Sequence, residues 1–109
     1  MIIEWERVAE LHAEIGADGF GEVVELFLEE ADEVIARIAC QSGASALEAD
    51  LHFLKGAALN LGFADFAALC AEGERRANAG DTDIDLAAVR QCYAQSRQEL
   101  MQGLDRVAA

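Results

Sequence analysis

Proline is absent from this 109-residue sequence, and lysine, histidine and cysteine are scarce. Because proline interrupts helices, its absence permits long helical segments, and a hydrophobic content of 53% argues against disorder. No stretch approaches the ~20 consecutive apolar residues of a membrane span. We expect one domain over residues 1–109, long enough to bury a core without disulfides.

The three cysteines, Cys40, Cys70 and Cys92, are odd in number, far apart and without C-x-x-C spacing. This pattern is typical of reduced, apolar core residues in a cytoplasmic protein. The chain has only two histidines, so no ligand set for a transition metal is evident, and we expect no metal site. The acidic start at Glu4 and Glu6 is unlike a cleavable signal, which again favours the cytoplasm.

Basic residues are few: seven arginines and one lysine stand against 21 acidic residues, for a net charge of −13. Such a surface repels phosphate backbones and anionic lipids, so we expect neither nucleic acid nor membrane as a partner. Solubility alone accounts for an acidic excess of this kind. Glutamates crowded into residues 22–33 also favour a protein partner with basic residues near its contact face.

Between glycine-marked breaks, apolar residues recur every three or four positions, and no segment alternates with period two. The pattern predicts helices over about residues 3–15, 18–38, 45–62, 63–79 and 83–104. Asp18, Ser45 and either Thr82 or Asp83 are the expected N-caps. Short connections favour antiparallel neighbours. The predicted fold class is therefore all-α: an antiparallel up-and-down four-helix bundle, with its core over about 18–106, and a short N-terminal helix.

The third predicted helix carries the sequence HFLKG at residues 52–56. At about 100° per residue, Lys55, Gly56 and Leu59 share a face with His52, opposite an apolar stripe made by Leu47, Leu51, Leu54, Ala58 and Leu61. We therefore expect His52 to be exposed beside the only lysine of the chain. A phosphoryl group carried on an imidazole needs such a nucleophile, a nearby cation and an open approach.

Each of these neighbours also has a plainer explanation. Gly56, costly within a helix by about 1 kcal/mol, permits close approach of a partner or a phosphoryl group, or close packing of another helix. Lys55 either pairs with phosphate or is a solvated surface lysine. Leu59 indicates a docking surface, although single exposed leucines are common.

Residues 52–58, followed by Leu61-Gly62, closely resemble the signature of histidine-containing phosphotransfer (HPt) domains, and the resemblance extends over about residues 20–104. It implies that His52 takes a phosphoryl group from an aspartate of one receiver domain and passes it to another receiver. Lys55 would assist the phosphoryl oxygens and Gly56 would leave room for them. The implied protein is a phosphocarrier. Because the sequence has no glycine-rich nucleotide loop, we expect no kinase activity of its own, and because one exposed histidine suffices, we expect a monomer.

The same resemblance names the partners, which are receiver domains of response regulators or hybrid kinases. Mg²⁺ would come with the receiver, so we expect no cofactor on this chain. Family members often carry a polar residue, frequently glutamine, that binds the other ring nitrogen. A helical hairpin turning near Gly62 brings Glu74 level with His52, where it would accept a hydrogen bond from Nδ1 and orient Nε2. Otherwise Glu74 is a solvated glutamate.

A second class of function is an acidic helical module that binds a protein partner and carries no phosphate. His52 would then be incidental. A kinase dimerisation helix, which also displays a histidine, is disfavoured because Phe53 follows the histidine where an acidic residue is typical, and because proline is absent.

Overall fold

The computed structural model describes residues 2–41 and 43–108, with side chains as far as Leu104. Its helices are α1 (Trp5–Ile15), α2 (Ala17–Ile38), α3 (Ala44–Leu61), α4 (Ala64–Asn78) and α5 (Leu86–Ala108). Within these ranges the only extended pairing is an isolated antiparallel bridge between Ile3 and Phe63. Residues 1 and 109, the ends of the expected domain, lie outside the described residues. The predicted all-α class is confirmed.

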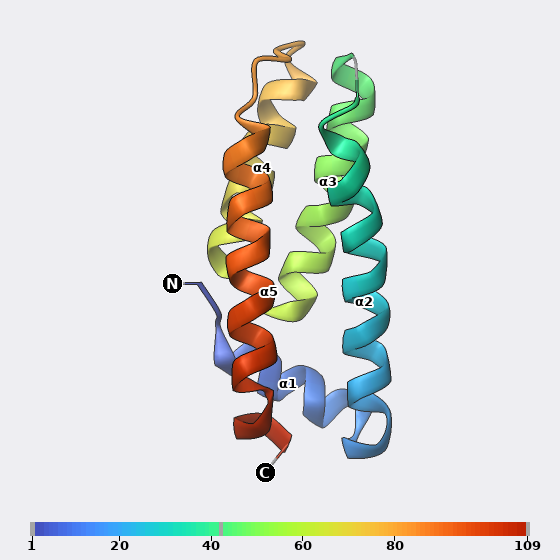
Figure 1. Ribbon diagram of the computed structural model, residues 1–109, viewed down its shortest axis with the longest axis vertical. Coiled ribbons are helices and arrows are strands. Elements are labelled where there is room, and N and C mark those ends of the chain that lie inside the picture. Colours follow the sequence, from blue (N-terminus) through green and yellow to red (C-terminus); the bar gives the residue numbers. More distant parts are fainter. Residues whose placement is uncertain (1, 42, 109) are drawn as a thin grey trace.

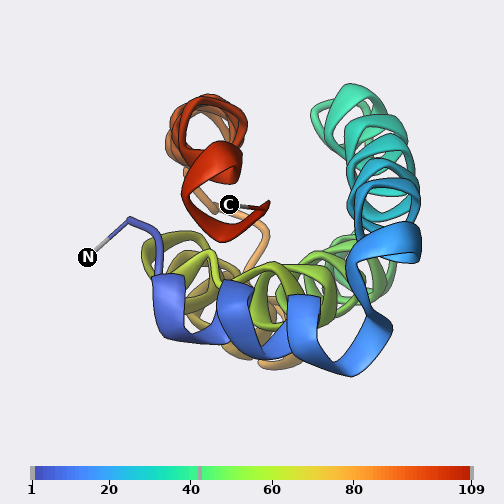
Figure 2. The ribbon, with the colours of Figure 1, turned by 90° about the horizontal axis from the view of Figure 1, so that it is seen from below.

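The helices α2 to α5 run alternately up and down the long axis of a molecule that measures 45 × 23 × 20 Å (Figure 1). The short helix α1 crosses the end of the bundle where the chain turns from α3 into α4 (Figure 1). Seen from below, α3 and α4 lie side by side next to α1, and α2 and α5 occupy the other two corners (Figure 2). This is the predicted four-helix bundle with a short N-terminal helix.

The core forms because each long helix turns a stripe of apolar residues inward, as spacings of three and four require. Ile38, Leu54 and Leu100, from three different helices, are fully buried. An aromatic cluster joins the α3–α4 turn to α5: the ring of Phe66 lies 5.3 Å from Tyr93 and 6.4 Å from Phe63. The bundle is thereby closed around a single apolar interior.

Gly62 ends α3 and fastens the N-terminal segment to the α3–α4 turn. Its φ of 75° is in the left-handed region that favours glycine. Its carbonyl oxygen accepts a hydrogen bond from the Glu4 backbone N–H at 2.7 Å. A β-carbon at this position would lie 2.7 Å from the Glu4 carbonyl oxygen, so only glycine fits here.

A buried carboxylate ties α2 to α3 close to His52. Asp50 is 4% exposed, and its Oδ1 accepts a hydrogen bond from Arg37 at 2.9 Å. Its Oδ2 accepts another from Gln41 at 2.8 Å. Because Asp50 precedes His52 by two residues, these bonds hold this part of α3 against the end of α2.

The expected caps at Asp18 and Ser45 are wrong. The residues preceding α2 and α3 are Gly16 and Gly43, with φ values of 93° and 103°, and neither helix has a side-chain cap. Gly16 also ends α1, so the chain turns from one helix into the next within a single residue. That turn requires a backbone conformation which asparagine, aspartate or serine would adopt only with strain.

At the start of α5 the expected caps, Thr82 and Asp83, are also wrong. Asp85 Oδ1 accepts a hydrogen bond from the Ala88 backbone N–H at 3.0 Å, which makes Asp85 the cap.

The expectation of three core cysteines holds only in part. Cys70 is buried, and this burial raises the pKa of its thiol to about 12. Cys92 is half-buried. Cys40 is exposed, because it follows the last residue of α2, where the chain leaves the bundle.

Candidate functional site

His52 lies on the outer face of α3, where its side chain is 69% exposed. The stripe predicted opposite it is buried at every position: Leu47, Leu51, Leu54, Ala58 and Leu61 are each at most 2% exposed. The helical repeat alone therefore accounts for the exposure of the histidine.

The α3–α4 turn brings Glu74 to this histidine. Gly62 reverses the chain, and α4 returns antiparallel to α3 (Figure 1). Glu74 Oε2 lies 2.7 Å from His52 Nδ1. An ionised carboxylate can only accept a hydrogen bond, so in the neutral imidazole Nδ1 carries the proton and Nε2 keeps its lone pair. The contact thus presents the unprotonated nitrogen away from Glu74.

Lys55 lies on the other side of the same carboxylate. Its Nζ is 2.6 Å from Glu74 Oε1, an atom shielded from solvent. This contact is an ion pair. Lys55 first, and then the hydrogen bond to His52, hold the pKa of Glu74 below its ordinary value, against the opposing effect of burial. Glu74 is consequently ionised at neutral pH.

Gly56 faces open space. A β-carbon built on it would have no atom within 4 Å, which contradicts close helix packing as the reason for this glycine. Asn60, one turn later, donates a hydrogen bond from Nδ2 to the Gly56 carbonyl oxygen at 3.1 Å. The structure thus leaves the approach to this stretch of α3 free.

Two hollows flank His52. The first, between α2 and α3, includes Phe27, Glu30, Phe53 and Gly56 in its lining. The second, between α3 and α4, is lined by Ser45, Glu48, Ala49, His52 and Glu74. Leu59, one turn beyond Gly56, is 60% exposed. Apolar and acidic side chains therefore surround the histidine on both sides.

Sequence reasoning missed Phe27, Phe53, Glu30 and Glu48 as neighbours of the histidine. Two of them had a signal in the sequence, because Phe53 directly follows His52 and Glu48 precedes it by one helical turn. The two residues of α2 had none, since their proximity depends on how α2 packs against α3.

Of the residues the structure describes, no three His, Cys, Asp or Glu side chains gather as a metal site. None of the helices in the described ranges is long and apolar enough to cross a membrane.

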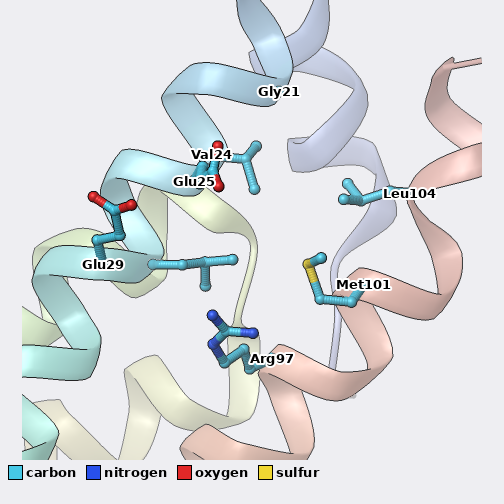
Figure 3. Close-up of a pocket in the computed structure, with 8 residues that line it drawn as sticks. Gly21, Val24, Glu25, Glu29, Arg97, Met101 and Leu104 are labelled. Atoms are coloured by element: carbon cyan, nitrogen blue, oxygen red, sulfur yellow. The ribbon is translucent and has the colours of Figure 1, made fainter.

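A separate groove of about 390 Å³ lies between α2 and α5. Val24, Met101 and Leu104 point toward one another across it, and Glu25 and Glu29 lie along α2 (Figure 3). Arg97, which also lines it, is held by hydrogen bonds to Asp32. None of its lining residues is shared with the hollows beside His52, so this groove is distinct from the candidate site.

Comparison with known proteins gives one finding. The family model for the Hpt domain matches residues 22–108, a range that contains α3, α4 and the whole candidate site. No curated protein and no solved structure matches the chain significantly. Hpt domains are phosphocarrier modules of phosphorelays that interact with receiver domains, and they are not kinases. The matched range covers most of the chain, which therefore belongs to the Hpt domain family of two-component phosphorelays.

Proposed function

We propose that His52 accepts a phosphoryl group from an aspartate of one receiver domain and passes it to an aspartate of another. The observation that carries this proposal is the exposed His52 ring, whose Nδ1 is bound to Glu74 while Nε2 is left with its lone pair. Nε2 is then the attacking atom, because a nucleophile needs an unshared electron pair directed at its target.

The transfer is an in-line displacement through a loose transition state, whose charge is spread over the phosphoryl oxygens. Lys55, one helical turn after His52, supplies a positive charge, and its flexible stem allows Nζ to move from Glu74 to these oxygens. We propose that Mg²⁺ is held by the acidic pocket of the receiver, and that this chain needs no cofactor of its own.

The proposed docking surface consists of His52, Phe53, Gly56 and Leu59 on α3, with Phe27 of α2 at its edge. Covering these apolar side chains with a receiver excludes water from the reacting phosphoryl group and favours transfer over hydrolysis. We propose a small, transient contact made by a monomer in the cytoplasm. Basic residues on the receiver would complement the glutamates of α2, so association should weaken as salt is added.

Transfer from a radiolabelled, phosphorylated receiver domain tests the proposal. The native chain and a His12→Gln variant should become labelled, because the ring of His12 packs edge-on against Phe20 within the α1–α2 corner. A His52→Gln variant should remain unlabelled. Label on His52→Gln would contradict the proposal, and binding of the receiver without label on any variant would favour the phosphate-free interaction module.

A further inference from the structure

We propose that Glu74 keeps the Nδ1 proton on phosphorylated His52, so that the phosphoryl group always leaves from a protonated ring. This inference rests on the proposed function and adds to it a control over how readily the phosphoryl group is released. It is distinct from merely orienting the ring, because a neutral amide at position 74 would orient the ring equally well.

The geometry carries the argument. Glu74 Oε2 lies 2.7 Å from His52 Nδ1, within the range of a strong, charge-assisted hydrogen bond. The opposite oxygen, Oε1, is shielded from solvent and lies 2.6 Å from Lys55 Nζ. The side chain of Glu74 is only 19% exposed, so water competes weakly with the His52 ring for this carboxylate.

The step balances without any external acid or base. The lone pair of Nε2 attacks phosphorus, the Nε2–P bond forms, and the bond from phosphorus to the receiver aspartate breaks with its electron pair going to the carboxylate. The proton on Nδ1 stays where it is, so the phosphorylated ring carries a positive charge beside Glu74. In the reverse step an aspartate oxygen of a receiver attacks phosphorus and the new O–P bond forms. The Nε2–P bond breaks, its electron pair returns to Nε2, and a neutral imidazole leaves.

Loss of the Nδ1 proton would change the leaving group. The phosphoryl group would then have to depart from an imidazole that becomes an anion, which is a far poorer leaving group. A carboxylate against Nδ1 opposes that loss, because it stabilises the cationic ring. Glu74 therefore keeps phospho-His52 ready for transfer at neutral and mildly alkaline pH.

Other charged groups facing the ring come from each helix around it. Glu48 lies on α3 itself, and Glu30 belongs to α2. Glu74 belongs to α4, and Lys55, on α3, pairs with its other carboxylate oxygen. In the described part of the chain, Glu74 is the carboxylate in hydrogen-bond contact with the ring. Glu30 and Glu48 act only through solvent, where salt screens them.

The test uses phosphoramidate, a small phosphodonor that needs no receiver, on the His12→Gln chain. The rate of phosphate loss from His52 is measured from about pH 5.5 to about pH 9 in this chain and in the same chain carrying Glu74→Gln. A third chain carrying Glu48→Gln is the control, because it loses the same charge at a carboxylate that does not contact the ring. Without the carboxylate the ring of phospho-His52 should lose its Nδ1 proton more readily, so release from Glu74→Gln should slow as the pH rises through the neutral range. At pH 8 it should be at least about tenfold slower than release from the chain that retains Glu74.

Chains that retain Glu74, including Glu48→Gln, should release phosphate at a rate that stays level to about pH 8. The Nδ1–H resonance of phospho-His52 should also remain visible there by nuclear magnetic resonance, a readout that needs no variant. Coincident pH profiles, absence of that resonance, or failure of phosphoramidate to label the exposed ring would each overturn the inference. Phosphoramidate labelling with the expected profiles but no transfer from any receiver would instead contradict the proposed function alone.

Discussion

Gly73 of α4 packs directly against Leu51 of α3: a β-carbon at position 73 would lie 2.9 Å from Leu51 Cδ1. Leu51 is fully buried and cannot withdraw into solvent. Gly73 and Leu51 immediately precede Glu74 and His52 in the chain. The close approach of Gly73 to Leu51 therefore sets the distance between Glu74 and His52. A contact in the core thus determines the geometry of the reactive surface.

Alanine substitutions at Gly73 and Gly56 should have different effects on stability. At Gly56 the new methyl group enters open space, so the gain in helix propensity should stabilise the fold by about 1 kcal/mol. At Gly73 the same gain is opposed by overpacking against Leu51, which costs about 1–3 kcal/mol. Urea unfolding measures both free energies. Equal stabilisation by the two substitutions would show that Leu51 yields freely.

A larger side chain at Gly56 should separate docking from chemistry. Gly56→Leu should leave the helices intact but slow transfer from a receiver by at least about tenfold, because the side chain occupies the approach to His52. Labelling by phosphoramidate, which is small, should be nearly unchanged. If the receiver transferred at the native rate, the partner would not approach over Gly56.

Removing the lysine should weaken transfer without affecting folding. Lys55→Ala should slow transfer by about tenfold and shorten the lifetime of phospho-His52. This loss of rate is smaller than that expected for a fully enclosed donor, because Lys55 is partly exposed. Lys55→Arg, which keeps the charge, should retain most of the rate. Helical content by circular dichroism should be unchanged in both. An unaltered rate in Lys55→Ala would remove Lys55 from the mechanism.

The contribution of Glu74 to stability should depend on pH. Its pKa is lowered in the folded chain by Lys55 and His52, so its contribution is present above the ordinary range of glutamate and is lost as the pH falls through the folded value. Glu74→Gln should therefore be less stable than the native chain at pH 7, by about 1 kcal/mol or less because both partners, His52 and Lys55, are partly exposed. At a pH well below the folded pKa of Glu74 the difference should vanish. Unfolding free energies that differ by the same amount at every pH would mean that the charge of Glu74 does not stabilise the fold.

Leu59 should contribute to the affinity for an unphosphorylated receiver. Leu59→Glu should raise the dissociation constant several-fold, because it places a charge in the proposed docking surface. Met101→Glu is a matched control on α5, where a similarly exposed apolar side chain lies in the separate α2–α5 groove. Titration calorimetry compares the two. A dissociation constant for Leu59→Glu within twofold of the native value would place docking elsewhere on the bundle.

Helical periodicity was sufficient to predict the bundle and the exposed face of α3, because an apolar stripe repeating every 3.6 residues has one way to be buried. It also brought Glu74 level with His52, since two antiparallel helices joined by a short turn keep a fixed register. The sequence did not predict that His52 and Lys55 share one carboxylate. That arrangement depends on how closely α3 and α4 pack at Gly73, and residue spacing along the chain does not give this distance. The contribution of α2 to the hollows has the same origin.

The helix starts were harder to predict, for a local reason. The residue before each of α2 and α3 is a glycine with positive φ, and the expected caps at Asp18 and Ser45 make no capping hydrogen bond. Sequence patterns favour the familiar polar cap. The positive φ values of Gly16 and Gly43 decided the outcome, and these values follow from where the neighbouring helices must lie.

The hydrogen bond from Glu4 to the Gly62 carbonyl constrains the order in which the molecule assembles. Its acceptor exists in the right place only after α3 and α4 have formed their hairpin, which needs contacts between near neighbours in the chain. We therefore expect α1 to dock late in folding and to detach early in unfolding. Amide hydrogens of α1 should exchange with solvent while those around Leu54 remain protected, so the end of the bundle opens and closes without disturbing the register of the histidine.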